Sequence, residues 1–307
     1  MAKALENLSQ GLIVKKNILV TGAGGQLGSE LRQLSRHIGE NILFADIFSS
    51  EDEETIRLDI TDSLEVERFF KDNDIGIVVN CAAYTNVEKA EEDEISANLV
   101  NNIGASALAS AAKSVDATLI HISTDYVFDG KSSVPYSEND RTSPCSVYGL
   151  TKLAGERAIA ASGCKSIIIR TAWLYSVYGK NFVSTMRRLT AEKDSLNVVF
   201  DQIGSPTNAA DLAQLIIHII TTGQTDKTGI YHYTDEGVCS WYDFAVEICH
   251  LSENECDVRP CLSEEFPTKA VRPHYSVLDK SKVKRTFGIV IPYWKDSLKK
   301  YFDSNLK

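Results

Sequence analysis

Short apolar runs alternate with helix-length amphipathic segments through the first half of this chain, and this alternation restricts the fold more than any other feature. The apolar runs span 17–21, 41–45, 55–58, 75–79, 118–122 and 166–169, and helical patterns at 64–70, 95–114 and 152–161 lie between them. Strands that are apolar throughout are typical of a parallel sheet covered by helices on both faces. We therefore predict an α/β fold with a doubly wound, Rossmann-like parallel sheet, which binds its ligands beyond the carboxyl ends of the strands.

The second half of the chain is less regular and predicts a separate, smaller region. A length of 307 residues suffices for about two domains. We predict a leader at 1–16, with a weak amphipathic helix, and a dinucleotide-binding domain at 17–172, to which the chain returns around 208–234. A smaller mixed C-terminal substrate domain is then built from 173–207 and 235–307. The second half of the chain contains strand candidates at 197–200 and 229–233 and helix candidates at 209–220 and 241–251.

Charge and composition exclude several classes of protein. The chain carries 32 basic and 42 acidic residues, a net charge of −10, whereas nucleic-acid binders usually show a basic surplus. No apolar run approaches the ~20 residues of a membrane span or the roughly 7–15 of a secretory signal. The seven cysteines are scattered and lack the paired spacing of zinc sites. We predict a cytoplasmic protein with reduced cysteines and with no nucleic-acid, membrane or metal partner.

Three glycines, Gly22, Gly25 and Gly28, follow the first predicted strand directly and open the first predicted helix. Glycines allow a tight turn and a close approach to phosphates, and the unpaired N–H groups of the helix start suit a pyrophosphate. We predict a dinucleotide site here that also includes Gln26 and Leu27. Its spacing, G-x-x-G-x-x-G, differs from the common G-x-G-x-x-G.

An acidic residue ends the second predicted strand, where a carboxylate would bind the hydroxyls of an adenosine ribose. This residue is Asp46, which lies 18 positions beyond Gly28. The alternative is a carboxylate that caps a helix or turn. After the third predicted strand, Asp59 and Ile60 are placed to reach the adenine, and a simple turn explains them equally well.

A tyrosine and a lysine four residues apart, Tyr148 and Lys152, share one face of a predicted helix. Reduction of a ketone by hydride transfer creates an alkoxide that needs a proton, and a phenol can supply it. The unperturbed pKa of a phenol is about 10, and we expect a neighbouring ammonium to lower it. Thr124, which ends the fifth predicted strand, is placed to hold the carbonyl oxygen. The alternative is a surface Tyr–Lys pair without function.

Taken together, these motifs resemble the extended short-chain dehydrogenase/reductases, and more closely their dTDP-4-dehydrorhamnose reductase branch. The resemblance covers roughly 17–302 and is carried by 21–28, by Asn80-Cys81-Ala82-Ala83, and by the longer stretches 82–91, 123–130, 147–156, 170–175, 180–183, 201–207 and 272–278. It implies reduction of the C4 ketone of dTDP-4-dehydro-L-rhamnose to dTDP-L-rhamnose by NADPH or NADH, a step of dTDP-rhamnose and cell-wall polysaccharide biosynthesis.

The resemblance also implies roles for individual residues. It places the catalytic group on Thr124, Tyr148 and Lys152. The cofactor residues that it adds are Ala82, Ala83 and Tyr84, and Tyr148 and Lys152 contact the cofactor as well. Substrate binding falls on Thr85, Val87, Tyr126, Trp173, Asn181 and Arg272. Trp173 and Tyr126 each follow a predicted strand and are expected to form an apolar wall for the deoxysugar, with Arg272 facing its diphosphate.

Several alternatives stay open at this point. A core position would also explain Trp173, and a braced loop would explain Arg272. The regulatory subunit of methionine adenosyltransferase shares many of these motifs and acts as a binding partner, and a different nucleotide-sugar reductase or epimerase would keep the catalytic group. The choice between NADH and NADPH, a magnesium requirement and a homodimer are not determined by the sequence.

Overall fold

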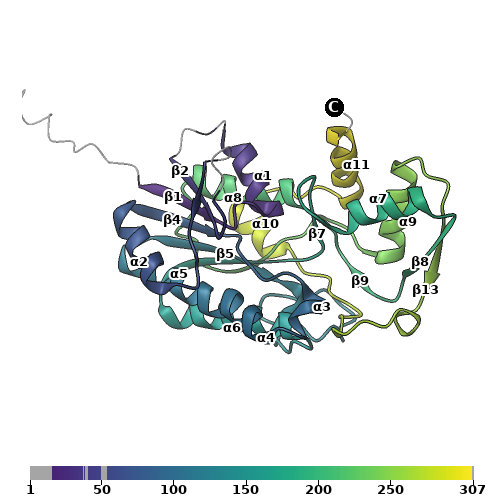
Figure 1. The fold of residues 1–307 in the computed structure, drawn as a ribbon, viewed down its shortest axis with the longest axis horizontal. Helices are drawn as coiled ribbons and strands as arrows, with labels where there is room; N and C mark the ends of the chain where they lie inside the picture. The colour runs from purple at the N-terminus through teal and green to yellow at the C-terminus, as the bar shows by residue number, and fades with distance from the viewer. Residues whose placement is uncertain (1–15, 37, 39–40, 50–53, 306–307) are drawn as a thin grey trace, which may run out of the picture.

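The computed structural model describes residues 16–36, 38, 41–49 and 54–305, and a seven-stranded sheet forms its centre (Figure 1). The strands are β1 (Asn17–Thr21), β2 (Ile42–Asp46), β3 (Thr55–Arg57), β4 (Ile75–Asn80), β5 (Thr118–Thr124), β6 (Lys165–Thr171) and β11 (Gly229–His232). Their order is β11-β6-β5-β4-β1-β2-β3, and every neighbouring pair is parallel. The predicted doubly wound sheet is confirmed, and its order reverses between β1 and β4, the point where such sheets bind ligands.

Helices cover both faces of this sheet. One face carries α1 (Gln26–Ser35), α8 (Ala209–Thr221) and α10 (Ser281–Phe287), and the other carries α2 (Ser63–Asp72), α5 (Ala105–Ser114) and α6 (Val147–Ser162). Val20 packs in the core of the first face and its neighbour Leu19 in the core of the second. Because successive side chains of a strand point to opposite faces, burial on both sides explains the unbroken apolar runs. Helix α10 joins this core although its residues lie within 235–307.

The helix predicted at 95–114 is not continuous. It consists of α4 (Glu94–Asn98), a π-helical segment, η3 (Leu99–Gly104), and α5. Within η3 the buried Asn101 accepts a hydrogen bond from the N–H of Tyr84 at 2.9 Å and donates to the hydroxyl of Thr151 at 3.1 Å. The wider turn therefore coincides with an amide that links the loop after β4 to α6, a relation that apolar periodicity does not reveal.

The second region forms its own aromatic core, on the right of Figure 1. Its helices are α7 (Phe182–Glu192), α9 (Trp241–Leu251) and α11 (Trp294–Asn305), and its short paired strands are β7 (Leu174–Tyr175) with β10 (Thr207–Asn208), β9 (Ile203–Gly204) with β12 (Cys239–Ser240), and β8 (Ser195–Val199) with β13 (Asp257–Cys261). The strand predicted at 197–200 and the helix predicted at 241–251 are thus present, the strand shifted by one or two residues.

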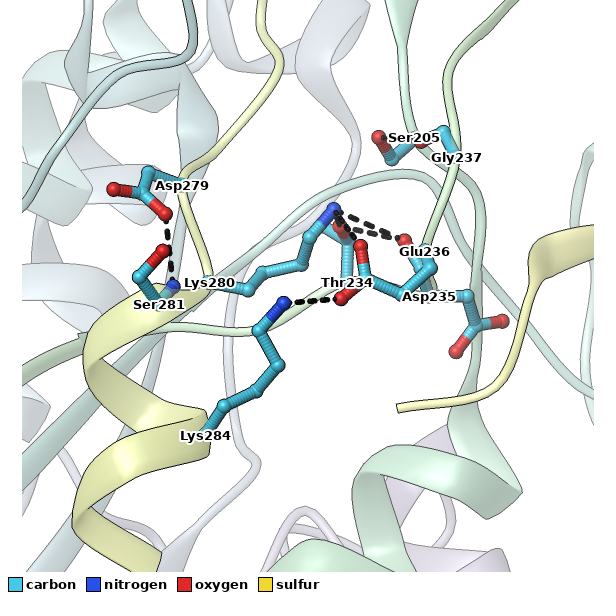
Figure 2. Close-up of polar contacts among 9 residues, drawn as sticks. All are labelled: Ser205, Thr234, Asp235, Glu236, Gly237, Asp279, Lys280, Ser281 and Lys284. Carbon is cyan, nitrogen blue, oxygen red and sulfur yellow. Dashed lines mark hydrogen bonds and ion pairs between the residues drawn. The ribbon is translucent and has the colours of Figure 1, made fainter. Parts of the chain in front are cut away.

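A largely buried polar cluster joins the loop after β11 to α8, α10 and α11, and Figure 2 shows the part of it between that loop and α10. We call Asp211, Asp235, Glu236, Lys280 and Ser297 the junction cluster. The ammonium of Lys280 donates to the backbone oxygen of Asp235 at 3.3 Å and lies 3.5 Å from the carboxylate of Glu236. The hydroxyl of Ser297 donates to the carboxylate of Asp211 at 2.6 Å. These contacts connect the sheet to the second region of the chain.

Two predictions from the sequence concern the ends of the chain and the membrane. The leader at 1–16 lies, apart from its last residue, outside the described residues. Within the part of the chain that the structure describes, no helix combines the length and the apolar composition needed to cross a bilayer.

Candidate active site

The loops after the parallel neighbours β1 and β4 approach each other closely at the point where the strand order reverses. Gly22 has φ +70°, and a Cβ atom at this position would lie 2.5 Å from the backbone nitrogen of Ala82. Both the left-handed backbone and the lack of space therefore require glycine here. Gly28 cannot be replaced either, for lack of space alone, because its Cβ would lie 2.3 Å from the carbonyl oxygen of Gly22. The glycines thus hold the loops after two strands against the start of α1.

The start of α1 fits the pyrophosphate of a dinucleotide. Its N-cap residue, Gly25, has no side chain, so the first N–H groups of the helix receive no side-chain cap. These groups and the helix dipole favour an anion. Leu27 is buried in the core, which leaves its backbone as the part near the turn. Gln26 accepts a hydrogen bond from the side chain of Asn181 at 3.1 Å, which brings a residue predicted for the substrate beside one predicted for the cofactor.

The carboxylate of Asp46 supports the same turn from the end of β2. It accepts hydrogen bonds from the N–H of Gly24 at 2.9 Å and from that of Ile47 at 2.7 Å. Asp59 accepts from the N–H and the hydroxyl of Thr61 at 2.9 and 2.7 Å, as in a turn, and Ile60 is buried. Asp46 therefore lies against the glycine turn, whereas the Asp59 side chain is occupied within its own loop.

Thr124 and Tyr148 meet where β5 ends and α6 begins. The hydroxyl of Ser146 caps α6 by accepting from the N–H of Gly149, and a Cβ on Gly149 would lie 2.3 Å from the carbonyl oxygen of Tyr126. This close approach brings the rings of Tyr126 and Tyr148 edge to face, with centroids 5.5 Å apart. Burial raises the pKa of Tyr148 to about 12, although a hydrogen bond with Thr124 acts in the opposite direction.

Lys152 is almost completely buried one turn further along α6. Its ammonium donates to the carbonyl oxygen of Ile122 at 2.6 Å, and burial lowers its pKa to about 8, against the charge of Glu156. The sequence predicts that this ammonium lowers the pKa of Tyr148 below the usual value, and that net lowering is wrong for the chain alone, because burial raises the pKa to about 12. Loss of solvation dominates the phenol, and the lysine is directed toward β5.

Asp125 is a residue of the site that the sequence interpretation did not assign. It is 2% exposed and accepts a hydrogen bond from the hydroxyl of Thr124 at 2.9 Å. Burial raises the pKa of its carboxyl to about 6, against hydrogen bonds from Ser276 and Thr124. A carboxyl group whose pKa lies near neutrality beside a candidate catalytic group is typical of functional sites. Its position directly after Thr124 was the available signal.

The aromatic residues predicted for the sugar lie in two settings. Tyr126 packs on Tyr148, whereas Trp173 stacks on Trp241, with ring centroids 3.5 Å apart and an interplanar angle of 8°. Trp173 has φ +49°, and a Cβ on Gly204 would lie 2.6 Å from its indole, so its ring is held between Gly204 and Trp241. This packing fixes the ring and fits both the predicted wall and the core alternative.

One of the residues predicted for the substrate, Arg272, lies at an open cavity of about 530 Å³. The guanidinium of Arg272 lines it and donates to the carboxylate of Glu88 at 2.8 Å. Thr85 and Val87 lie at the start of α3 (Val87–Ala90), beside Asn86, which also lines the cavity. Among the described residues, no group of three or more His, Cys, Asp or Glu side chains is arranged to hold a metal ion.

The sheet order, the glycine turn and the Tyr-x-x-x-Lys pair define the class of this protein, an oxidoreductase of the extended short-chain dehydrogenase/reductase type that uses a nicotinamide cofactor. A family model described as the RmlD substrate binding domain matches residues 16–306. The chain belongs to the dTDP-4-dehydrorhamnose reductase family.

Individual relatives agree over nearly the whole length. A dTDP-4-dehydrorhamnose reductase of Aggregatibacter actinomycetemcomitans is 42% identical and covers 92% of this chain and 97% of its own. The crystal structure of such a reductase from Clostridium acetobutylicum superposes with a TM-score of 0.88 at 44% identity, covering 95% of this chain and 100% of its own. The reductase from Bacillus anthracis, in complex with NADP, gives 0.85 at 37% identity over the same shares. These relatives favour the reductase over the regulatory-subunit alternative.

Proposed function

We propose that this chain reduces the C4 ketone of dTDP-4-dehydro-L-rhamnose to dTDP-L-rhamnose. The observation that carries the proposal is the meeting of Thr124 and Tyr148 at the carboxyl edge of the sheet, the same edge at which the uncapped start of α1 lies. A cofactor bound on that helix start and a ketone held by Thr124 occupy neighbouring positions on one edge of the sheet. We infer the identity of the sugar from relatives such as those of Aggregatibacter actinomycetemcomitans and Escherichia coli, which are named dTDP-4-dehydrorhamnose reductases.

A nicotinamide cofactor supplies the hydride to C4, and the residues of the chain manage the oxygen. On substrate binding the hydroxyl of Thr124 turns from the carboxyl of Asp125 to donate to the ketone oxygen, and the phenol of Tyr148 gives its proton to the alkoxide as the C–H bond forms. Since the pKa of Tyr148 is about 12, the phenol is fully protonated at neutral pH, as a donor must be. An alkoxide is a stronger base than a phenolate, so the transfer is downhill.

Lys152 assists this transfer through its charge. With a pKa of about 8, most of the side chain is an ammonium at pH 7. A cation on the same helical face as Tyr148 stabilises the phenolate that remains after the proton has left. We assign Lys152 a second contact, to the ribose next to the nicotinamide, in line with the family pattern.

For the adenosine end of the cofactor we propose that Asp46 binds the ribose hydroxyls, as it can in NADH. Its carboxylate lies against the glycine turn, where it would repel the 2′-phosphate of NADPH. The solved relative from Bacillus anthracis holds NADP, so we expect both cofactors to support turnover.

The substrate extends from Tyr148 toward the open cavity beside α3. Trp173 and Tyr126 cover the apolar faces and the methyl group of the deoxysugar, and Arg272 binds the diphosphate, with Thr85, Val87 and Asn181 around them. The position of Arg272 at the cavity supports this orientation.

The test of this function is oxidation of NADPH or NADH by the purified chain. The substrate is generated in the assay from dTDP-glucose by a dTDP-glucose dehydratase and the following epimerase. We expect turnover that depends on both auxiliary enzymes and yields dTDP-L-rhamnose. Turnover of a different nucleotide sugar, with none of this one, would replace the substrate but keep the chemistry.

A further inference from the structure

Three polar side chains on neighbouring strands form a buried line that ends at Lys152. Thr21, Asn80 and His121 are direct cross-strand partners on β1, β4 and β5, so their side chains lie side by side on one face of the sheet. The hydroxyl of Thr21 donates to Oδ1 of Asn80 at 2.8 Å, and Nδ2 of Asn80 lies 3.0 Å from Nδ1 of His121. The line ends where Nε2 of His121 lies 3.4 Å from Nζ of Lys152.

The backbone fixes the direction of these hydrogen bonds. The N–H of Ala82 donates to Oδ1 of Asn80 at 3.1 Å, and a backbone N–H cannot accept. The NH₂ group of Asn80 must therefore face His121 and donate to its Nδ1. A neutral imidazole that accepts at Nδ1 carries its proton on Nε2. Burial and the charge of Lys152 hold the pKa of His121 well below its usual value, which keeps the ring neutral.

The result is an N–H donor that points at the lysine. An ammonium has only donors, so facing this N–H is unfavourable for it, whereas a neutral amine offers a lone pair that accepts the bond. The other groups facing Lys152 are the carbonyl of Ile122, which accepts its hydrogen bond, and the carboxylate of Glu156, whose charge favours the ammonium. Cys81 also faces the lysine, but burial raises the pKa of its thiol to about 12, so the thiol is neutral. His121 acts against the charge of Glu156.

We propose that His121, held by Asn80 with its proton on Nε2, is a positioning residue that shifts Lys152 toward its neutral amine form and so sets the upper pH limit of the reduction. Reduction needs the ammonium, because it stabilises the phenolate of Tyr148. The effect on activity rests on the proposed function, whereas the tautomer of His121 does not.

The first experiment reads the tautomer directly in the unaltered chain. Two-bond ¹H–¹⁵N spectra of the ¹⁵N-histidine-labelled protein distinguish the two neutral tautomers and the imidazolium, and the His121→Gln variant assigns the signal among the six histidines. We expect a neutral ring with the proton on Nε2 throughout pH 6–9. A proton on Nδ1, or an imidazolium at pH 7, overturns the proposal.

The second experiment uses Asn80→Asp to reverse the direction of the hydrogen bonds between residue 80, His121 and Lys152. A carboxylate still accepts from the N–H of Ala82, but it now also accepts from His121. The proton moves to Nδ1, and Nε2 then accepts from the ammonium of Lys152. We expect the alkaline limb of the pH profile of kcat/KM to move up by about one pH unit or more. An unchanged limb in a folded variant overturns the proposal.

A double variant separates the effect transmitted through the hydrogen bonds of His121 from the direct effect of the added carboxylate charge. In the His121→Phe background, Asn80→Asp adds the same carboxylate without an imidazole between it and the lysine. We expect a clearly smaller shift than in the native background, and an equal shift means that His121 plays no part. Melting temperature and NADH affinity report whether each variant is folded. If the parent reduces no dTDP-sugar, the proposed function fails, and the spectra of the parent still decide the tautomer.

Discussion

Two buried polar clusters in this molecule look alike in their chemistry and differ in what surrounds them. The proposed active-site cluster comprises His121, Thr124, Asp125, Tyr148 and Lys152, of which all but Tyr148 are buried, and it lies toward the carboxyl ends of the central strands. The junction cluster lies beside the outermost strand, β11, and joins the sheet to the second region (Figure 2). Both hold groups with strongly shifted pKa values: burial lowers the pKa of Lys152 to about 8 and raises that of Asp235 well above its usual value.

The difference lies in what the buried groups hold. In the junction cluster the ammonium of Lys280 donates to the backbone oxygen of Asp235 in the loop after β11. The side chain of Asp235 accepts from the N–H of Asn208 at the start of α8. These contacts fasten segments of one chain together. The proposed active-site cluster lies instead at the same carboxyl edge of the sheet as an uncapped helix start and a glycine turn. A shifted pKa alone therefore does not identify a catalytic group, because structural networks produce the same shift.

The largest expected effect is at the glycine turn. Gly22→Ala places a Cβ 2.5 Å from the backbone of Ala82, so the two loops must separate and the pyrophosphate site is lost. Titration of NADH fluorescence should show no saturable binding. The matched control is Gly223→Ala, at φ +67° with open space around it, which bears only the backbone strain and should bind NADH normally. Normal NADH binding by Gly22→Ala would show that the glycine turn has a role in packing and none in cofactor binding.

Removal of the proton donor tests the active-site cluster itself. Tyr148→Phe deletes one oxygen and should lower kcat by about 100-fold or more, with the fold and the affinity for NADH retained. Steady-state kinetics with the dTDP-sugar measure the loss. The comparison of clusters predicts that Asp235→Asn, at a buried position of the junction cluster, keeps kcat within about threefold. Similar losses in both variants would remove the distinction drawn above.

Trp173 tests how far the site extends into the second region. Trp173→Ala removes the expected wall for the sugar and should lower kcat/KM by about 5- to 150-fold, the scale of one buried apolar group, with NADH binding near normal. Its stacking partner provides the control, since Trp241→Phe weakens the same stack but removes no predicted sugar contact. A drop in melting temperature with normal kinetics of the folded variant would make Trp173 a core residue.

The junction cluster is expected to affect how the free energy of unfolding depends on pH. Burial and the charge of Asp211 raise the pKa of Asp235 in the folded chain, so the folded state keeps a proton that the unfolded state releases above about pH 4. The free energy of unfolding therefore falls as pH rises, by at most about 1.4 kcal/mol per pH unit for this group. Melting temperatures should fall between pH 5 and 8, and less steeply in Asp235→Asn.

A second carboxyl of opposite character controls this measurement. Hydrogen bonds from Ser96 lower the pKa of Asp93 below its usual value, so this group titrates outside the range of the experiment. Asp93→Asn should leave the slope between pH 5 and 8 unchanged. A slope that is equal in the parent and in Asp235→Asn would show that the junction carboxyl is not protonated in the folded chain.

The smallest effect concerns cofactor choice. Asp46→Ala removes the carboxylate that would repel a 2′-phosphate and should shift the ratio of kcat/KM values toward NADPH by about tenfold. Because the same carboxylate accepts from the N–H of Gly24, some loss of affinity for both cofactors is expected. Asp46→Asn retains a hydrogen-bond acceptor without the charge and is the control. An unchanged ratio in both variants would place the ribose elsewhere.

The strands of the sheet were predictable because each one is a local, unbroken apolar run. Strand β1 and helix α9 begin and end where the pattern of residues predicts them, at 17–21 and 241–251. The glycine turn was predictable for the same reason, since the strand before it and the helix after it are adjacent in the sequence. The π-helical segment in 95–114 was not, because the contacts of Asn101 with Tyr84 and Thr151 join residues 17 and 50 positions apart.

The sequence by itself determined the class of fold, the glycine turn, and the residue types that reduction of a ketone requires, because periodicity and short spacings encode these features locally. Only the tertiary structure decided how the chemistry is tuned. The pKa of Tyr148 follows from burial rather than from its lysine neighbour, and the register of β1, β4 and β5 sets Asn80 and His121 in line with Lys152. Solvation and strand register depend on segments far apart in the chain, and no local pattern carries them.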